Sequence, residues 1–212
     1  ADTTTGLVGW WKMDQASGTD VLDSSGNGYN GYFNGSLAWT GTSLDFTGGK
    51  VSFTAGNTTN VFSTVDRQMT VSFWINLENS SRCDLYYIKD NTTATSDNHV
   101  EAGGNGSADT WCYVGAGKNL LVEWGTNVAE NDNYVGYVGN WRLITVVKDA
   151  DGGELIDPND PASGNTGIAK LYVNGVMVAS ATKSPSWNGG NYMNYGIKGS
   201  GINLLQFGGG GY

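Results

Sequence analysis

The chain has 212 residues, 39% of them hydrophobic, which suits one large all-β domain with a sizeable core. Its net charge is −9, with 11 lysines and arginines and no basic cluster, which argues against nucleic acid and anionic membranes as partners. No run of about 18 apolar residues occurs, so the sequence predicts no membrane insertion. The 33 glycines, beside abundant tyrosine and tryptophan, indicate many turns rather than a disordered linker.

Alternation of polar and apolar residues predicts strands along the chain. Residues 70–76 (TVSFWIN) alternate as a half-buried strand does. Residues 119–124 (NLLVEW) predict a second strand. Residues 141–147 (WRLITVV) are apolar on both faces, which is typical of a central strand of a sandwich. No segment has a convincing helical period, so we expect little or no helix.

The strongest local prediction is a β-hairpin over residues 168–180. Asn174-Gly175 separates two β-rich runs, 170–173 and 176–179. Asn-Gly supplies the two positive-φ residues of a type I′ turn, whose twist matches that of the flanking strands. The register that follows pairs Val173 with Val176, Tyr172 with Met177 and Leu171 with Val178.

Long polar stretches separate the predicted strands, at residues 78–110, 125–139, 149–167 and 183–201. Loops of this length are uncommon in compact domains and are usually functional or mobile. No break in composition and no internal repeat indicates a second domain. We therefore expect one domain over residues 1–212.

Two cysteines, Cys83 and Cys112, flank a polar stretch. In an exported protein they favour a disulfide, and the alternative is two separate buried thiols. The sequence begins Ala1-Asp2-Thr3, as a chain trimmed by a signal peptidase would, although an artificial start explains it equally well. We expect a secreted protein that is extracellular or on the cell surface.

Six segments match the motifs of one family in order and spacing. They are residues 6–14 (GLVGWWKMD), 21–28 (VLDSSGNG), 44–46 (LDF), 69–75 (MTVSFWI), 140–146 (NWRLITV) and 171–175 (LYVNG). Together they resemble laminin-G-like jelly-roll domains of the concanavalin A-like lectin/glucanase superfamily. The resemblance implies an all-β fold, a two-sheet antiparallel β-sandwich (jelly roll) with long loops. It implies little about function, because one fold hosts many activities.

The chain departs from this family at residues 204–212 (LLQFGGGGY). Family domains usually end with a further strand, of the type I-D-D-V-R-I-Y, beside the first strand near the middle of a sheet. The sequence predicts a domain without that strand. Unpaired backbone groups buried in a sheet cost about 1–3 kcal/mol each, and the apolar segment Val8 to Met13 should be buried. We therefore expect the position beside it to be filled by a strand donated by another chain or by the run 204–207, shifted into that place.

Residues 23–30 (DSSGNGYN) offer a carboxylate, amide oxygens and backbone carbonyls within one tight loop. Calcium takes six to eight oxygen ligands of these kinds. The candidate ligands of a structural Ca2+ are Asp23, Asn27, Asn30 and Asp14. The resemblance supports this site, because the family often carries a calcium here, although one of its ligands comes from the missing strand. The alternative is a glycine-rich turn in which Asp23 caps backbone N–H groups.

Carbohydrate binding is the function that the loops favour. Sugars stack their C–H faces on aromatic rings while polar side chains hold the hydroxyl groups. Two loops combine aromatic and amide residues, and the candidate ligand-binding residues are Trp187, Tyr192 and Tyr195 in one and Tyr134, Tyr137 and Asn133 in the other. The alternative is that each ring packs beneath its own loop.

Catalysis finds little support in the sequence. His99 is the only histidine, and we expect it at the surface. Glycosidases of this fold usually carry the pattern E-x-D-x-x-E, whereas Glu123 has no carboxylate two residues away. We expect a binding module, not an enzyme, whose partner is a glycan or a protein. The alternative is a structural subunit of a cell-surface homo-oligomer or filament, completed by strand donation.

Overall fold

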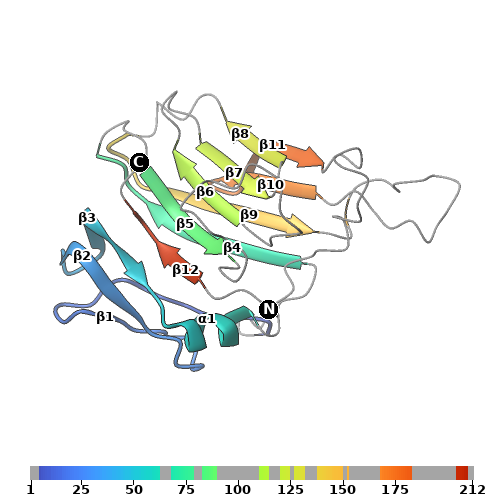
Figure 1. Ribbon diagram of the computed structural model, residues 1–212. Helices are drawn as coiled ribbons and strands as arrows, with labels where there is room; N and C mark the ends of the chain where they lie inside the picture. Colours follow the sequence, from blue (N-terminus) through green and yellow to red (C-terminus); the bar gives the residue numbers. More distant parts are fainter. Residues whose placement is uncertain are drawn as a thin grey trace, which may run out of the picture.

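The computed structural model describes several stretches of the chain: residues 5–62, 68–78, 83–89, 110–114, 120–124, 127–131, 138–149, 152, 168–182 and 204–209. Within them the chain forms two antiparallel β-sheets stacked face to face and one short helix, α1 (Ala55–Phe62) (Figure 1). The two-sheet β-sandwich that the sequence predicts is therefore confirmed. No helix in these stretches has the length and apolar character needed to cross a membrane.

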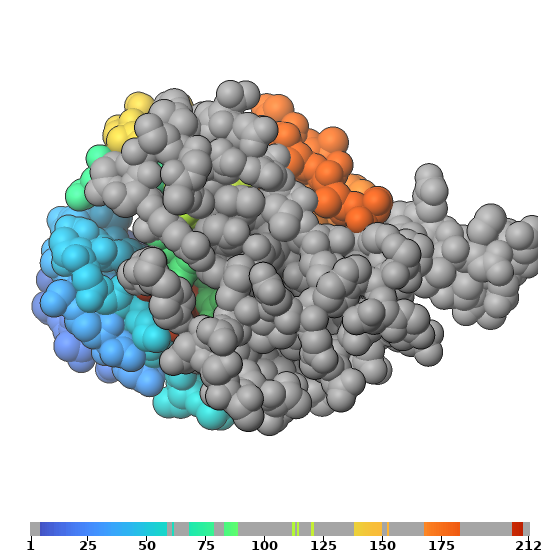
Figure 2. All heavy atoms as spheres, turned by 45° about the horizontal axis from the view of Figure 1, so that its top comes forward, coloured from blue at the N-terminus to red at the C-terminus, as the bar shows by residue number. Residues whose placement is uncertain are grey.

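The larger sheet has eight described strands and the smaller sheet four. From edge to edge, the larger sheet contains β1 (Asp20–Val21), β2 (Gly31–Trp39), β3 (Leu44–Ser52), β12 (Leu204–Phe207), β5 (Cys83–Lys89), β6 (Thr110–Val114), β7 (Leu120–Trp124) and β8 (Asn127–Asn131). The smaller sheet contains β11 (Val176–Thr182), β10 (Ile168–Val173), β9 (Arg142–Asp149) and β4 (Gln68–Ile75). In the space-filling view, the N-terminal strands (blue) and the β10–β11 hairpin (orange) lie on opposite sides of the visible face (Figure 2).

The inward-facing side chains of both sheets fill the space between them. The larger sheet contributes the buried residues Val51, Tyr86, Ile88, Cys112, Val114 and Leu120, and the smaller sheet contributes Ile144, Val146, Leu171 and Val173. The ring of Phe73 on β4 meets that of Tyr86 on β5 edge-on, with 6.1 Å between their centroids. Fully burying an apolar side chain of this size stabilises the fold by about 1.5–3 kcal/mol, so the inward stripe of each strand fixes which face it turns to the core.

The strands predicted from alternation are present. β4 alternates between exposed and half-buried residues along its whole length, as expected of a half-buried strand. β9 lies between β10 and β4, which is the central position that its apolar faces predict. β7 corresponds to the strand predicted at residues 119–124.

Two strands lie in segments that the sequence predicts as long loops, and the helix lies where no helical period is evident. β5 falls within the predicted loop 78–110, and its buried positions include the polar residue Asp84, which an apolar pattern does not predict. β8 falls within the predicted loop 125–139. α1 begins after Thr54, whose Oγ1 accepts a hydrogen bond from Asn57 N at 3.2 Å. This capping threonine is the sequence signal for the helix.

The β10–β11 hairpin confirms most of the predicted register. Val173 lies opposite Val176 and Tyr172 opposite Met177. Asn174 and Gly175 have φ values of 50° and 79°, as a type I′ turn requires. The prediction for Leu171 is wrong by one residue, because a bulge between Leu171 and Tyr172 places Leu171 opposite Ala179 instead of Val178.

The run 204–207 forms β12 between β3 and β5, in the middle of the larger sheet. The segment Val8 to Met13 belongs to neither sheet among the described strands, and it makes one isolated bridge, from Trp11 to Asp23. The expectation that this segment is buried is wrong in part, because Trp10 is 51% exposed. Trp11 and Met13 nevertheless pack against the core.

Candidate functional site

The outer face of the smaller sheet carries an exposed aromatic patch. Trp74 is 63% exposed and Trp141 is 49% exposed. Trp74 lies on β4 opposite Leu143 of β9. Trp141 stands two residues before Leu143, so the alternation of side chains places it on the same face. We call Trp74, Trp141 and Leu143 the tryptophan platform.

Alternation also explains why the platform faces outward. The other side of β4 presents Met69, Val71, Phe73 and Ile75, all of which pack against the core. Trp74 lies between Phe73 and Ile75, so it has to leave the sheet on the opposite side. Its indole ring is therefore exposed because the core already takes both of its neighbours.

A row of hydroxyl groups borders the platform. Ser72 lies opposite Thr145, and their side-chain oxygens are hydrogen-bonded at 2.8 Å. Thr145 in turn lies opposite Tyr172 of β10. We call Ser72, Thr145 and Tyr172 the hydroxyl row. It is two residues along each strand from the platform, a separation of about 7 Å, and neither set contains a charged side chain.

The edges of the platform are polar and neutral. Asn76 follows β4, and Asn140 directly precedes Trp141; both are exposed. Asn140 donates a hydrogen bond through Nδ2 to the Val138 carbonyl oxygen at 3.3 Å. Asn174 Oδ1 accepts a hydrogen bond from Leu143 N at 3.0 Å, which fastens the hairpin to β9 beneath the platform. Amide groups therefore lie next to two exposed indole rings on the outer face of the smaller sheet.

The outer face of the larger sheet carries a polar row of a different kind. The strand register aligns Tyr32, Ser52, Gln206 and Tyr87 across β2, β3, β12 and β5. Lys50 Nζ donates a hydrogen bond to Gln206 Oε1 at 3.1 Å. Ser52 is only 7% exposed. This row is therefore less open to a ligand than the tryptophan platform is.

Asp23, the first candidate calcium ligand, is the centre of a hydrogen-bond network. Its Oδ1 accepts from Trp10 N at 2.9 Å and Ser25 N at 2.8 Å, and its Oδ2 accepts from Ser25 Oγ at 2.8 Å and Tyr29 N at 3.0 Å. Partial burial raises the pKa of Asp23, but these hydrogen bonds lower it by more, so the pKa lies below its ordinary value of 3.8. This is the capping arrangement that the sequence leaves as the alternative to calcium.

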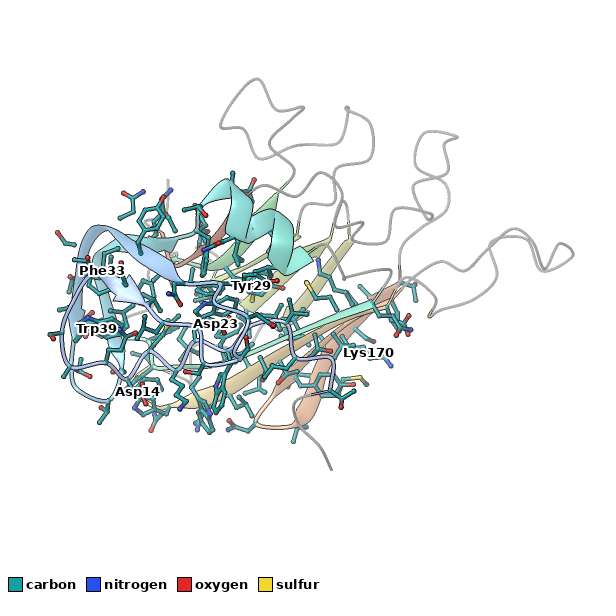
Figure 3. All side chains as sticks on the ribbon, turned by 90° about the horizontal axis from the view of Figure 1, so that it is seen from below. Asp14, Asp23, Tyr29, Phe33, Trp39 and Lys170 are labelled. Atoms are coloured by element: carbon teal, nitrogen blue, oxygen red, sulfur yellow. The ribbon has the colours of Figure 1, made fainter. Side chains whose placement is uncertain are left out.

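The side chains of two other candidate calcium ligands form hydrogen bonds of their own. Asn30 Oδ1 accepts from Asp23 N at 2.9 Å, and Asn27 Nδ2 donates to Val8 O at 2.9 Å. Asp14 is exposed and does not converge on Asp23 (Figure 3). In the part of the chain that the structure describes, no three His, Cys, Asp or Glu side chains could hold a metal ion. Amide and backbone carbonyl oxygens, which calcium also accepts as ligands, are not among these groups, so calcium at this loop stays a prediction.

Cys83 and Cys112 are free thiols in the structure, not the disulfide that the sequence favours. They lie on the neighbouring strands β5 and β6, but Cys83 is opposite Val114 and Cys112 is opposite Tyr86, so they are not directly paired. Burial, with a contribution from the Asp84 carboxylate, raises the pKa of Cys83 to about 11. Burial also raises the pKa of Cys112. Both shifts favour the protonated thiol over the reactive thiolate at neutral pH.

The loop residues predicted to bind a ligand lie outside the described residues: Trp187, Tyr192, Tyr195, Tyr134, Tyr137 and Asn133. Sequence reasoning missed the tryptophan platform. The signal for it is in residues 70–76, where Trp74 shares the solvent side of the strand with Thr70 and Ser72. A single exposed tryptophan is common on protein surfaces, so this signal becomes informative only when the strand pairing brings Trp141 to the same face.

No protein-family model and no curated protein sequence matches the chain. Several solved structures do match the chain. A mutant of HCR D/C VPI 5995 has a TM-score of 0.55 at 12% identity, and the botulinum neurotoxin serotype C1 binding domain has 0.52 at 14%. The binding domain of botulinum neurotoxin DC in complex with SialylT has 0.51 at 12%. Each match covers 94% of this chain and 42–43% of the other, so the chain spans less than half the length of these proteins. At such identities the likeness shows the fold alone, and it confirms the fold that the sequence resemblance implies.

Proposed function

We propose that this concanavalin A-like β-sandwich is a carbohydrate-binding module that holds a neutral sugar on the tryptophan platform. The observation that carries the proposal is the exposure of two tryptophans, 63% for Trp74 and 49% for Trp141, on one face of the smaller sheet. Burial of apolar surface stabilises a protein or a complex by about 25 cal/mol per Å², and surface left in water lacks that stabilisation. A patch of large apolar side chains rimmed by polar residues is the mark of a binding surface.

The chemistry of the tryptophan platform and the hydroxyl row suits a sugar better than a protein. An indole ring offers a flat apolar face to the C–H groups of a pyranose ring, and the hydroxyl row offers both donors and acceptors to its hydroxyl groups. The absence of charge from Trp74, Trp141, Leu143 and the hydroxyl row favours a neutral glycan over a charged one. The neighbour of the same fold that was solved with SialylT supports a glycan ligand.

We propose binding without catalysis. Glycosidases work with two carboxyl groups about 5–10 Å apart. Neither the tryptophan platform nor the hydroxyl row contains a carboxyl group. The purified chain should therefore release no reducing sugar from a polysaccharide that it binds, and measurable release would overturn this part of the proposal. An extracellular or cell-surface location belongs to the same proposal.

The test is binding to a panel of neutral soluble polysaccharides, measured by affinity electrophoresis and then by calorimetry. We expect Trp74→Ala and Trp141→Ala each to weaken binding about tenfold, because a stacking contact contributes about 1.4 kcal/mol. Trp10→Ala is the matched control, since Trp10 is 51% exposed but lies on the N-terminal segment. Binding that survives both platform substitutions, or that is lost equally in the control, would refute the site.

A further inference from the structure

The tryptophan platform lies at one end of an uncharged strip on the neighbouring strands β4 and β9 (Figure 1). The strand register places three pairs of residues side by side on the outer face: Trp74 with Leu143, Ser72 with Thr145, and Thr70 with Val147. We call these three pairs the neutral strip. Its members on β4 are all exposed, and its members on β9, which has a strand on each side, are half-buried. Successive pairs are about 7 Å apart along the strands, so the strip measures about 14 Å from its first pair to its last.

Charged side chains border the neutral strip beyond its last pair and on its β10 side. Beyond Thr70 and Val147, the next pair along the strands is Gln68 with Asp149. Gln68 Nε2 donates a hydrogen bond to Asp149 Oδ1 at 3.1 Å. On β10, Lys170 lies opposite Val147 (Figure 3). The surface is therefore uncharged in the direction of the strands, whereas a lysine lies directly across the strands from the last pair.

Across the strands, the uncharged surface continues from the middle pair of the strip. At the first pair, Leu143 meets the hairpin turn instead of a further strand, because Asn174 N donates to Leu143 O at 2.8 Å and Asn174 Oδ1 accepts from Leu143 N at 3.0 Å. The middle pair continues through Tyr172 of β10 to Met177 of β11, which is 54% exposed. A neutral chain that stacks on the platform therefore meets more uncharged partners along the strands than across them.

We infer that the ligand of the platform is a linear neutral glycan whose chain runs along β4 and β9 and covers the neutral strip with at least three linked sugar units. The inference rests on the proposed function and names the kind of glycan that the same site takes. The strip is two strands wide, about 5 Å between strand axes, which suits one unbranched chain. Its length of about 14 Å is more than one pyranose ring covers, and three linked rings cover it.

Each pair of the strip offers chemistry that suits one sugar unit. The platform stacks on the C–H face of the first unit. The hydroxyl groups of Ser72 and Thr145 can donate to and accept from the hydroxyl groups of the next unit. Thr70 offers a further hydroxyl group to the third unit, and Val147 offers it an apolar contact. Each added unit should therefore strengthen binding until the strip is covered.

The test measures affinity against chain length by calorimetry. The probes are linear gluco-, xylo- and manno-oligosaccharides, each from the disaccharide to the hexasaccharide. For the series that binds best, affinity should rise about fivefold with each unit that adds one net hydrogen bond, and then level off. Equal affinity for the disaccharide and the hexasaccharide overturns the inference, and so does the failure of all three series to bind.

Two further substitutions test the direction of the chain. Thr70→Val removes the hydroxyl group at the far end of the strip, so it should weaken hexasaccharide binding about fivefold and leave disaccharide binding unchanged. Thr182→Val is the matched control, because Thr182 is an exposed threonine of the same sheet but lies on β11, outside the strip. Met177→Ala tests the route across the strands. Equal effects of Thr70→Val and Thr182→Val, or a larger loss from Met177→Ala than from Thr70→Val, overturn the lengthwise chain.

Trp74→Ala distinguishes failure of this inference from failure of the proposed function. If Trp74→Ala weakens binding of every oligosaccharide equally while chain length has no effect, the platform binds sugar and the lengthwise chain is wrong. If Trp74→Ala leaves the affinities and their dependence on length unchanged, the platform is not the site and both proposals fail.

Discussion

Replacing Asp23 by alanine tests whether one carboxylate organises the N-terminal loop. The substitution removes four hydrogen bonds, those from Trp10 N, Ser25 N, Ser25 Oγ and Tyr29 N. At about 0.5–1 kcal/mol each, which is the lower part of the usual range because the loop is partly exposed, the loss is about 2–4 kcal/mol. For a chain of this length that corresponds to a fall in Tm of about 5–15 °C.

The assay is chemical and thermal unfolding followed by tryptophan fluorescence. Asp20→Ala is the matched control, because Asp20 is an exposed carboxylate three residues earlier and should change stability by less than about 0.5 kcal/mol. If Asp23→Ala unfolds with the same midpoint as Asp20→Ala, the carboxylate does not organise the loop and the reasoning fails.

The pH dependence of the Asp23 effect has a definite sign. Because hydrogen bonds hold the pKa of Asp23 below its ordinary value of 3.8, the carboxylate stabilises the folded state above that value. The contribution is lost as the pH falls through the lower pKa of the folded state. The difference in free energy of unfolding between the unmodified chain and Asp23→Ala should therefore be constant near neutral pH and shrink below about pH 4. Thermal unfolding with and without chelator tests the calcium prediction separately: a fall in Tm on chelation supports calcium, and an unchanged Tm supports the hydrogen-bonded turn.

Two other predictions follow from the strands. Gly175→Ala should lower the free energy of unfolding by about 1 kcal/mol, because φ at this position is 79°. The matched control is Gly56→Ala, since at both positions nothing lies within 4 Å of the new methyl group. If both variants unfold with the same midpoint, the predicted turn strain at Gly175 is contradicted. The free thiols of Cys83, which is partly buried, and Cys112, which is buried, should resist a thiol reagent at pH 8 in the folded chain and react fully in denaturant. Fast labelling of both cysteines in the folded chain would contradict their burial. If denaturation without reductant exposed no free thiol, the cysteines would be oxidised, which would contradict the structure.

Local patterns predicted the parts of the fold that local forces decide. The β10–β11 turn follows from the two positive-φ residues Asn174 and Gly175, and no distant contact has to be known to place it. The same holds for β4, whose alternation is read directly from residues 70–76. The one-residue error at Leu171 arises from a bulge, and a bulge leaves no mark in a pattern of apolar and polar residues.

Distant contacts decide the parts that the sequence did not predict. β5 becomes a strand because it pairs with β12, more than a hundred residues later, and with β6. Asp23 offered both a calcium ligand and a turn cap, and only the positions of Trp10 N and Tyr29 N distinguish the two. The tryptophan platform was overlooked because Trp74 and Trp141 are far apart in sequence and meet only through the pairing of β4 with β9.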